Sequence, residues 1–203
     1  MISVTSMPKA GRLYQIVLSL SPASDNEDVS VYYLVHLPSC GSHQSVWSGG
    51  AYVGSPETAT GAAIDKVVHV VAGYLHDQAR GVSQIVAQKA APPQKTTPFQ
   101  ILENMEHAIS ATRDFLEQVK EHAERNEIPT EYIECHINDF NTCSYLVGQI
   151  RNSIDQKTGE QEQPSLKEML SRLLEELGKT IGRASSDLGA KQSGVVYLSG
   201  LDK

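Results

Sequence analysis

Two imidazoles and a thiol are grouped in one short segment of the chain, at His36, Cys40 and His43. Side chains of these types can ligate a metal ion or activate a nucleophilic cysteine. Their spacing matches no specific zinc or protease motif, and a fourth ligand or an orienting acid would have to come from elsewhere in the chain. The competing interpretation is an ordinary surface turn, because histidines and cysteines are common in loops. The group therefore supports an enzyme hypothesis only as an alternative.

Two further groups of chemically capable residues follow from helical spacing. Asp65, His69 and His76 fall within a narrow arc of an expected helix, where a carboxylate and an imidazole four residues apart can share a metal ion. A similar ridge on a later helix comprises Cys135, Asp139 and Cys143. Both groups are also explained without a ligand, if their members simply pack beside a buried apolar stripe. We therefore predict no metal ligand, no cofactor and no catalytic residue.

A strip of acids lies further along the chain, with Asp114, Glu117, Glu121 and Glu124 separated by three or four residues. On one helix face, like charges at these spacings destabilise each other by roughly 0.2–0.5 kcal/mol per pair. Only Glu121 has an obvious opposite charge on the same helix, at Arg125. A solvated helix face is the competing interpretation. The alternative is that the strip docks onto a basic surface of another protein.

The helix that carries this acidic strip has the clearest start in the chain. Thr97 and Gln100 form a capping box around Pro98, which suits a first helical position, so a helix is predicted over 97–125. Its apolar positions recur at alternating spacings of three and four residues and share one face. These positions are Leu102, Met105, Ile109, Thr112, Leu116, Val119 and Ala123. Such a face needs a partner helix.

Two more helices are predicted after this one. A helix over 129–154 begins at a proline, and a helix over 165–181 begins with a Ser-x-x-Glu capping box. The first of the two is apolar on two sides, since Tyr132, Cys135 and Leu146 point away from its main stripe. Tyr132 and Leu146 are therefore candidate partner-binding residues. Because this second apolar side needs a cover, we also expect the protein to form a homo-oligomer.

The N-terminal part of the chain has the two-residue period of β-strands. Apolar and polar residues alternate over 12–21 and 29–37, and a third strand is predicted over 45–53. A glycine pair at 49–50 suggests a bulge or bend in the third strand. A helix over 56–76 follows, with an apolar stripe that would lie across one face of the sheet.

These elements predict an α+β fold with two parts. Residues 1–80 form a β-β-β-α domain, in which one helix covers a small antiparallel three-stranded sheet. Residues 81–97, rich in Gln, Ala, Lys and Pro, form a linker. Residues 98–184 form an acidic antiparallel helical hairpin that extends to a bundle of three helices. Residues 185–203 are a tail or add an edge strand to the sheet.

Charge and hydropathy narrow the classes of function. The net charge is −7, and the excess of acidic side chains falls within residues 98–184. Without a basic surface, direct nucleic-acid binding is not expected. No stretch approaches the roughly 20 consecutive apolar residues of a membrane-spanning helix, so no membrane contact is expected. Residues 1–15 lack the pattern of a secretion signal, and a cytoplasmic location is expected.

The leading hypothesis from these features is a non-enzymatic protein–protein interaction module, an adaptor or inhibitor that acts through its acidic helical segment. Its partner would be another protein with a basic surface. The first alternative is an enzyme with a site between sheet and bundle that uses His36, Cys40 and His43. The second alternative is an acidic nucleic-acid mimic that blocks a nucleic-acid-binding protein.

Overall fold

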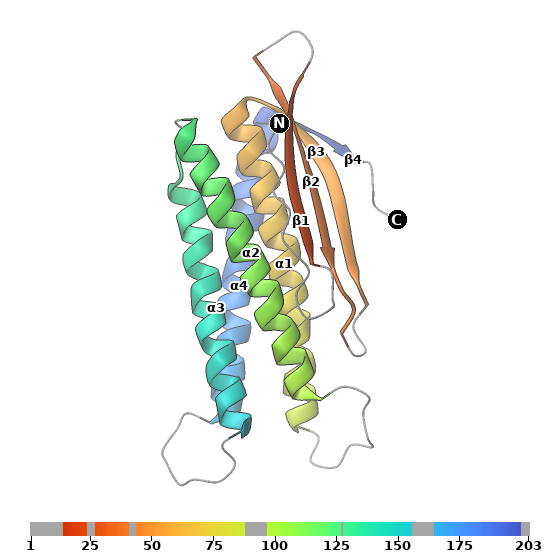
Figure 1. Ribbon diagram of the computed structural model, residues 1–203, viewed down its shortest axis with the longest axis vertical. Helices are drawn as coiled ribbons and strands as arrows, with labels where there is room; N and C mark the ends of the chain where they lie inside the picture. The colour runs from red at the N-terminus through yellow and green to blue at the C-terminus, as the bar shows by residue number, and fades with distance from the viewer. Residues whose placement is uncertain are drawn as a thin grey trace.

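An antiparallel sheet packs along one side of a bundle of long helices (Figure 1). The computed structural model describes residues 14–23, 27–40, 44–87, 97–126, 128–155 and 165–199. Within them the chain order is three strands, four α-helices, a single 3₁₀ turn and a fourth strand. The predicted α+β class is confirmed. The sheet has one strand more than predicted, and the first helix joins the later three.

The sheet comprises β1 (Gln15–Pro22), β2 (Val29–Leu37), β3 (Val46–Gly54) and β4 (Val195–Ser199), in the order β1-β2-β3-β4. β4 is the edge strand that was predicted as one of two possibilities for residues 185–203. The glycine pair at 49–50 makes no bulge, because β2 and β3 pair residue for residue along their whole length. Gly50 instead makes room for β4, since a Cβ atom there would lie 2.7 Å from the Tyr197 hydroxyl oxygen.

The helices are α1 (Pro56–Ala87), α2 (Pro98–Arg125), α3 (Glu131–Asp155) and α4 (Leu166–Lys191). The two capping boxes predicted at the starts of α2 and α4 are present. α1 and α4 extend beyond their predicted ends, so residues 81–87 are helical rather than linker and residues 185–191 are helical rather than tail. Each of the two helices packs along the other, and this tertiary contact supports turns that sequence propensity alone left undecided. The rest of the predicted linker, residues 88–96, lies outside the described residues.

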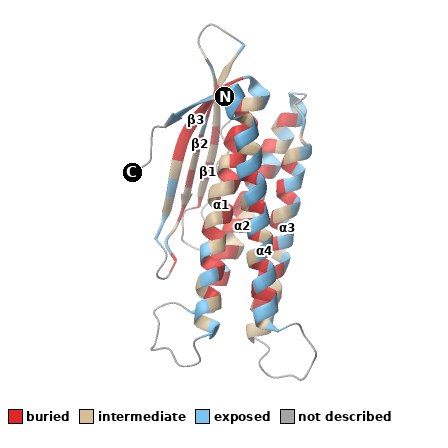
Figure 2. Cartoon of the chain, turned by 180° about the vertical axis from the view of Figure 1, so that it is seen from behind, coloured by how far each residue is buried: buried red, intermediate tan, exposed pale blue. Residues whose placement is uncertain are grey.

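α1 belongs to both layers of the structure. It packs against β2 and β3 on one side and against α2 and α4 on the other (Figure 1). α3 lies between α2 and α4, diagonally across the bundle from α1. The buried apolar side chains form one continuous cluster from the sheet to α3 and α4, and the red interior faces in Figure 2 follow it. The division of the chain into domains of residues 1–80 and 98–184 stays a prediction.

A chain of hydrogen bonds between buried polar groups joins the sheet to two of the helices. The hydroxyl of Tyr14, just before β1, donates to Oδ1 of Asn104 in α2 at 2.5 Å. Nδ2 of Asn104 donates to the hydroxyl of Tyr74 in α1 at 2.5 Å. That hydroxyl donates to the carbonyl oxygen of Pro38, after β2, at 2.7 Å. These bonds fix α1 and α2 relative to the sheet.

No helix in the described ranges has both the length and the hydropathy of a membrane span.

We predict that Asn104→Leu lowers the free energy of unfolding by about 1–3 kcal/mol, because it removes the amide shared by two buried hydroxyls. Urea denaturation followed by circular dichroism measures this change. Asn141→Leu is the matched control, since Asn141 is exposed on α3 and its replacement should change stability by less than about 0.5 kcal/mol. Equal stability of the two variants would show that the network does not hold the layers together.

Candidate functional site

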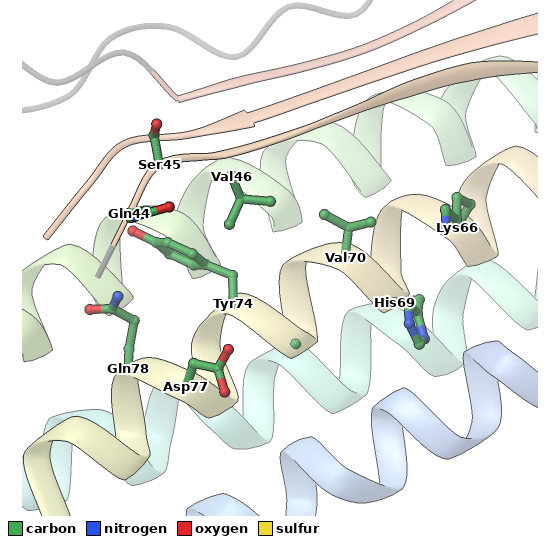
Figure 3. Close-up of a pocket in the computed structure, with 10 residues that line it drawn as sticks. Gln44, Ser45, Val46, Lys66, His69, Val70, Tyr74, Asp77 and Gln78 are labelled. Carbon is green, nitrogen blue, oxygen red and sulfur yellow. The ribbon is translucent and has the colours of Figure 1, made fainter. Parts of the chain in front are cut away.

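A groove of about 520 Å³ runs between the start of β3 and the middle of α1. Its volume lies within the range of about 300–1,000 Å³ that is usual for ligand-binding clefts. Figure 3 shows Tyr74 and Gln78 projecting from α1 toward the segment that leads into β3. The lining residues are Gln44, Ser45, Val46, Lys66, His69, Val70, Gly73, Tyr74, Asp77 and Gln78.

One wall of the groove is the beginning of a strand whose outer edge is only partly paired. β3 pairs with β2 along its whole length, whereas β4 pairs only with residues Gly50 to Gly54 of β3. No described residue pairs with the other edge of residues 46–49. Backbone amide and carbonyl groups on such an edge are available to another extended segment. The open edge and the groove meet at Val46.

Gln78 brings an unsatisfied amide to the same groove. Its side chain is 0% exposed, and neither Nε2 nor Oε1 has a hydrogen-bond partner among the described residues. A buried amide left in this state costs about 1–3 kcal/mol for each unmade bond, so it needs a specific explanation. One donor and one acceptor side by side match the hydrogen-bonding groups of a peptide unit. Gln78 is therefore a candidate ligand contact.

The remaining lining gives the groove charges of both signs and an open centre. Lys66 and His69 are half-buried, whereas Asp77 is exposed. The Nδ1 atom of His69 lies 2.9 Å from the hydroxyl oxygen of Ser185 in α4, which orients this imidazole at the helix-side wall. A Cβ atom at Gly73 would meet nothing within 4 Å, so this glycine leaves space in the groove.

A second polar cluster lies inside the bundle, where α1, α3 and α4 meet. Asp65 and His136 are 0% and 1% exposed, and His136 Nε2 lies 3.1 Å from Asp65 Oδ1. Lys191 donates to the other carboxylate oxygen of Asp65. One ligand atom from each of Asp65, His136 and Asp187 can be chosen so that all three lie within 4.8 Å of one another. Within the part of the chain that the structure describes, this group could hold a metal ion.

Tyr132 borders this buried cluster. The Lys191 ammonium nitrogen lies 5.1 Å from the centroid of the Tyr132 ring. The tyrosine hydroxyl is buried without a hydrogen-bond partner among the described residues. Burial, together with the negative charges of Asp65 and Glu57, raises the pKa of Tyr132 above its usual value. The hydroxyl therefore stays protonated and is available as a donor.

The acidic strip is exposed, but its charges are better paired than its spacing suggested. Lys120 contacts Glu124 at 3.8 Å and reaches across to Glu134 of α3 at 2.8 Å. The hydrogen bond to Glu134 raises the pKa of Lys120. Arg125 contacts Glu121 at 3.2 Å, as expected. Asp114 and Glu117 are exposed beside these pairs, so the repulsion that motivated a docking role is smaller than predicted.

The two apolar candidate contacts on α3 are occupied by the chain itself. Leu146 is 2% exposed and belongs to the continuous core. Tyr132 is half-buried and packs against that core beside Lys191. Of the second apolar side of α3, Leu146 and Tyr132 are therefore covered by the chain itself, whereas Cys135 is exposed. Self-association stays a prediction, but Leu146 offers no surface for it.

The proposed cysteine and histidine site is not assembled in the described residues. His36 lies on the outer face of the sheet and stacks on Trp47, with ring centroids 3.9 Å apart. Burial lowers the pKa of His36 below its usual value. Cys40 is buried on the core side, where its thiol donates to the carbonyl oxygen of Gln100 at 3.6 Å. His43 lies outside the described residues.

The fold also separates the members of the two residue groups that were identified from helical spacing. His69 bonds to Ser185 and lines the groove, while Asp65 faces the bundle interior. Asp139 pairs with Arg183 at 2.9 Å rather than with a cysteine. Burial, aided by the negative charges of Asp139 and Glu176, raises the pKa of Cys143 to about 12, so its thiol is unreactive at neutral pH.

Sequence reasoning missed His136 and Gln78, although each carries a recognisable signal. His136 stands on the apolar stripe of α3 with Ile133 and Phe140, three residues before it and four after it. Gln78 stands on the stripe of α1, three residues after Leu75. A polar residue on a buried stripe needs a partner from another element. The spacing indicates that each residue needs a hydrogen-bond partner, but it does not identify the residue that provides it.

No protein-family model, curated protein or solved structure matches this chain. Its function is therefore inferred from the geometry of its own residues.

Proposed function

We propose that the protein is a non-enzymatic interaction module, an adaptor or inhibitor, that holds an extended segment of a partner protein in the groove between β3 and α1. The observation that carries this proposal is the open edge of residues 46–49 beside a groove that contains the unpaired amide of Gln78. Both features are hydrogen-bonding groups without a partner among the described residues. Both match the chemistry of a peptide backbone.

The backbone of the partner segment would extend the sheet. A segment placed antiparallel to residues 46–49 would continue the line of β4, which already pairs with the other half of β3. Four paired residues span about 13 Å at the usual rise of a strand. In this position the segment would lie over the α1 side chains that line the groove. Main-chain bonds would then give affinity without requiring one particular sequence.

Side chains of the groove would supply the selectivity. Alternate residues of an extended segment point to opposite sides, so every second side chain would face α1. Val70 and Tyr74 offer apolar contact at the centre, whereas Lys66 and Asp77 offer charges of opposite sign. Gln78 would bond to a peptide unit of the segment. This arrangement favours a partner segment that mixes apolar residues with residues of both charges.

The acidic strip on α2 would act as a second, long-range contact. Asp114, Glu117, Glu121 and Glu124 are all exposed on the face opposite the buried stripe of the helix. Charges on a rim of this kind change the rate of association more than the strength of the final complex. The partner would therefore carry a basic surface in addition to the segment that enters the groove.

The enzyme alternative has less support from the geometry. His36 and Cys40 lie on opposite faces of the sheet, so a base and a nucleophile from this pair do not meet. General-base activation of a thiol needs the two atoms within hydrogen-bonding reach.

Our prediction for the groove is tested by selecting peptides from a random display library on the immobilised protein. Selected peptides should bind with micromolar affinity and should bind Gly73→Trp at least about tenfold more weakly, since an indole would fill the groove. Gly182→Trp is the matched control, because Gly182 also has nothing within 4 Å and does not line the groove. Failure to enrich any peptide that distinguishes these two variants would refute the groove as a peptide site.

The role of Gln78 is tested with the same selected peptides. Gln78→Leu should leave the free protein as stable as the parent or make it more stable, since a buried amide without a partner among the described residues is replaced by an apolar group. Peptide affinity should nevertheless fall by about tenfold. Isothermal calorimetry and urea denaturation measure the two effects. A variant that loses stability and keeps its affinity would mean that the amide serves the fold alone.

For the acidic strip, we predict that the double reversal Glu117→Lys with Glu121→Lys slows association with a basic partner protein that displays a selected peptide. The association rate of the parent should fall as salt rises, because the Debye length is about 8 Å at physiological ionic strength. Stopped-flow fluorescence gives the rates. The control reverses Glu27 and Glu175, which are exposed elsewhere and change the net charge equally. If both double variants associate at equal rates, the strip is only a solvated helix face.

A further inference from the structure

We propose that Asp65, His136 and Asp187 form a binding site for a divalent transition-metal ion, with Zn²⁺ as the ion that best suits their chemistry. Two carboxylates and one imidazole are the hard and borderline ligands that Zn²⁺ accepts. The three side chains come from α1, α3 and α4, three separate helices of the bundle. The proposal concerns the bundle interior and is independent of the groove.

The spacing of the ligand atoms is close to that of a metal site. Four-coordinate Zn²⁺ with bonds of about 2.1 Å holds its ligand atoms about 3.4 Å apart. His136 Nε2 and Asp65 Oδ1 are already 3.1 Å apart, and no ligand pair exceeds 4.8 Å. Asp187 is only half-buried, so its side chain has the freedom to complete the set. Three protein ligands leave one coordination position for water.

Two buried polar atoms beside the cluster point to a ligand. His136 Nδ1 has no hydrogen-bond partner among the described residues, although the residue is 1% exposed. A buried histidine with a purely structural role normally has both ring nitrogens bonded, so the second nitrogen of this ring lacks the partner that a structural role would give it. The Tyr132 hydroxyl is also buried and unpaired within the described ranges. It could donate to a metal-bound water.

Lys191 is the competitor for this position. Its ammonium group binds Asp65, and its chain passes over Gly61, where a Cβ atom would lie 3.0 Å from Lys191 Cε. The ammonium group of Lys191 compensates part of the negative charge of the two carboxylates. A divalent cation would take over that role when Lys191 is displaced, so the buried carboxylates keep a compensating positive charge in either arrangement.

Cobalt titration of the untagged 203-residue protein tests the proposal, with Co²⁺ as a coloured substitute for Zn²⁺. We expect visible absorption bands that saturate at one equivalent of Co²⁺ and disappear when Zn²⁺ is added. His136→Gln and Asp187→Asn should each weaken Co²⁺ binding by at least about tenfold. Lys191→Met should strengthen it, because the competing ammonium is gone.

Two controls separate this site from others. His69→Gln should leave Co²⁺ binding unchanged, since His69 bonds to Ser185 outside the cluster. Circular dichroism establishes that each variant is folded before it is titrated. The proposal is overturned if the parent protein shows no saturable Co²⁺ binding, or if folded His136→Gln and Asp187→Asn bind Co²⁺ as tightly as the parent. Neither result would affect the peptide groove, which shares no residue with this cluster.

Discussion

The burial of α1 on opposite sides is the constraint on which the rest of the structure depends. One side lies under β2 and β3, and the other lies against α2 and α4. Side chains such as Ile64, Val67, Val68, Val71 and Leu75 are fully buried along it. Each contributes roughly 1.5–3 kcal/mol relative to an exposed position. A helix with this much buried apolar surface joins the sheet and the bundle through one core.

This double burial also explains where the polar chemistry of the protein lies. Polar groups on the buried faces of α1 have no water to bond to, so each needs a partner from another element. Tyr74 meets Asn104 and Pro38, and Asp65 meets His136 and Lys191. Gln78 is the buried polar side chain of α1 that leaves both ends of an amide unsatisfied among the described residues. The cluster and the groove are therefore two consequences of one helix placed between layers.

The length of β4 completes the groove. α4 runs antiparallel to α1 and ends near its start, where Lys191 reaches Asp65 and the chain turns into β4. β4 then pairs with only one half of β3. Gly50 and Gly54 permit this close approach, since a Cβ atom at either would lie within 3 Å of the β4 side chain or the turn before it. The edge of residues 46–49 has no partner strand among the residues that the structure describes.

The sequence by itself determined the local elements, because their causes lie within a few residues. The capping boxes at Thr97 and Ser165 and the alternation in β1 and β2 correctly indicated where helices begin and which strand faces are buried. The same local patterns ended α1 and α4 too early. In α4 the additional turns are supported by contacts of Ser185 and Lys191 with α1. They also suggested a bulge or bend in β3, where a glycine makes room for Tyr197 instead.

Only the tertiary structure decided which polar residues meet. His136 is 71 residues from Asp65, and Lys191 is 126 residues from it, separations at which no short-range period carries information. The partners of a buried charge are set by which helices lie diagonally and side by side, and that is a property of the packed chain.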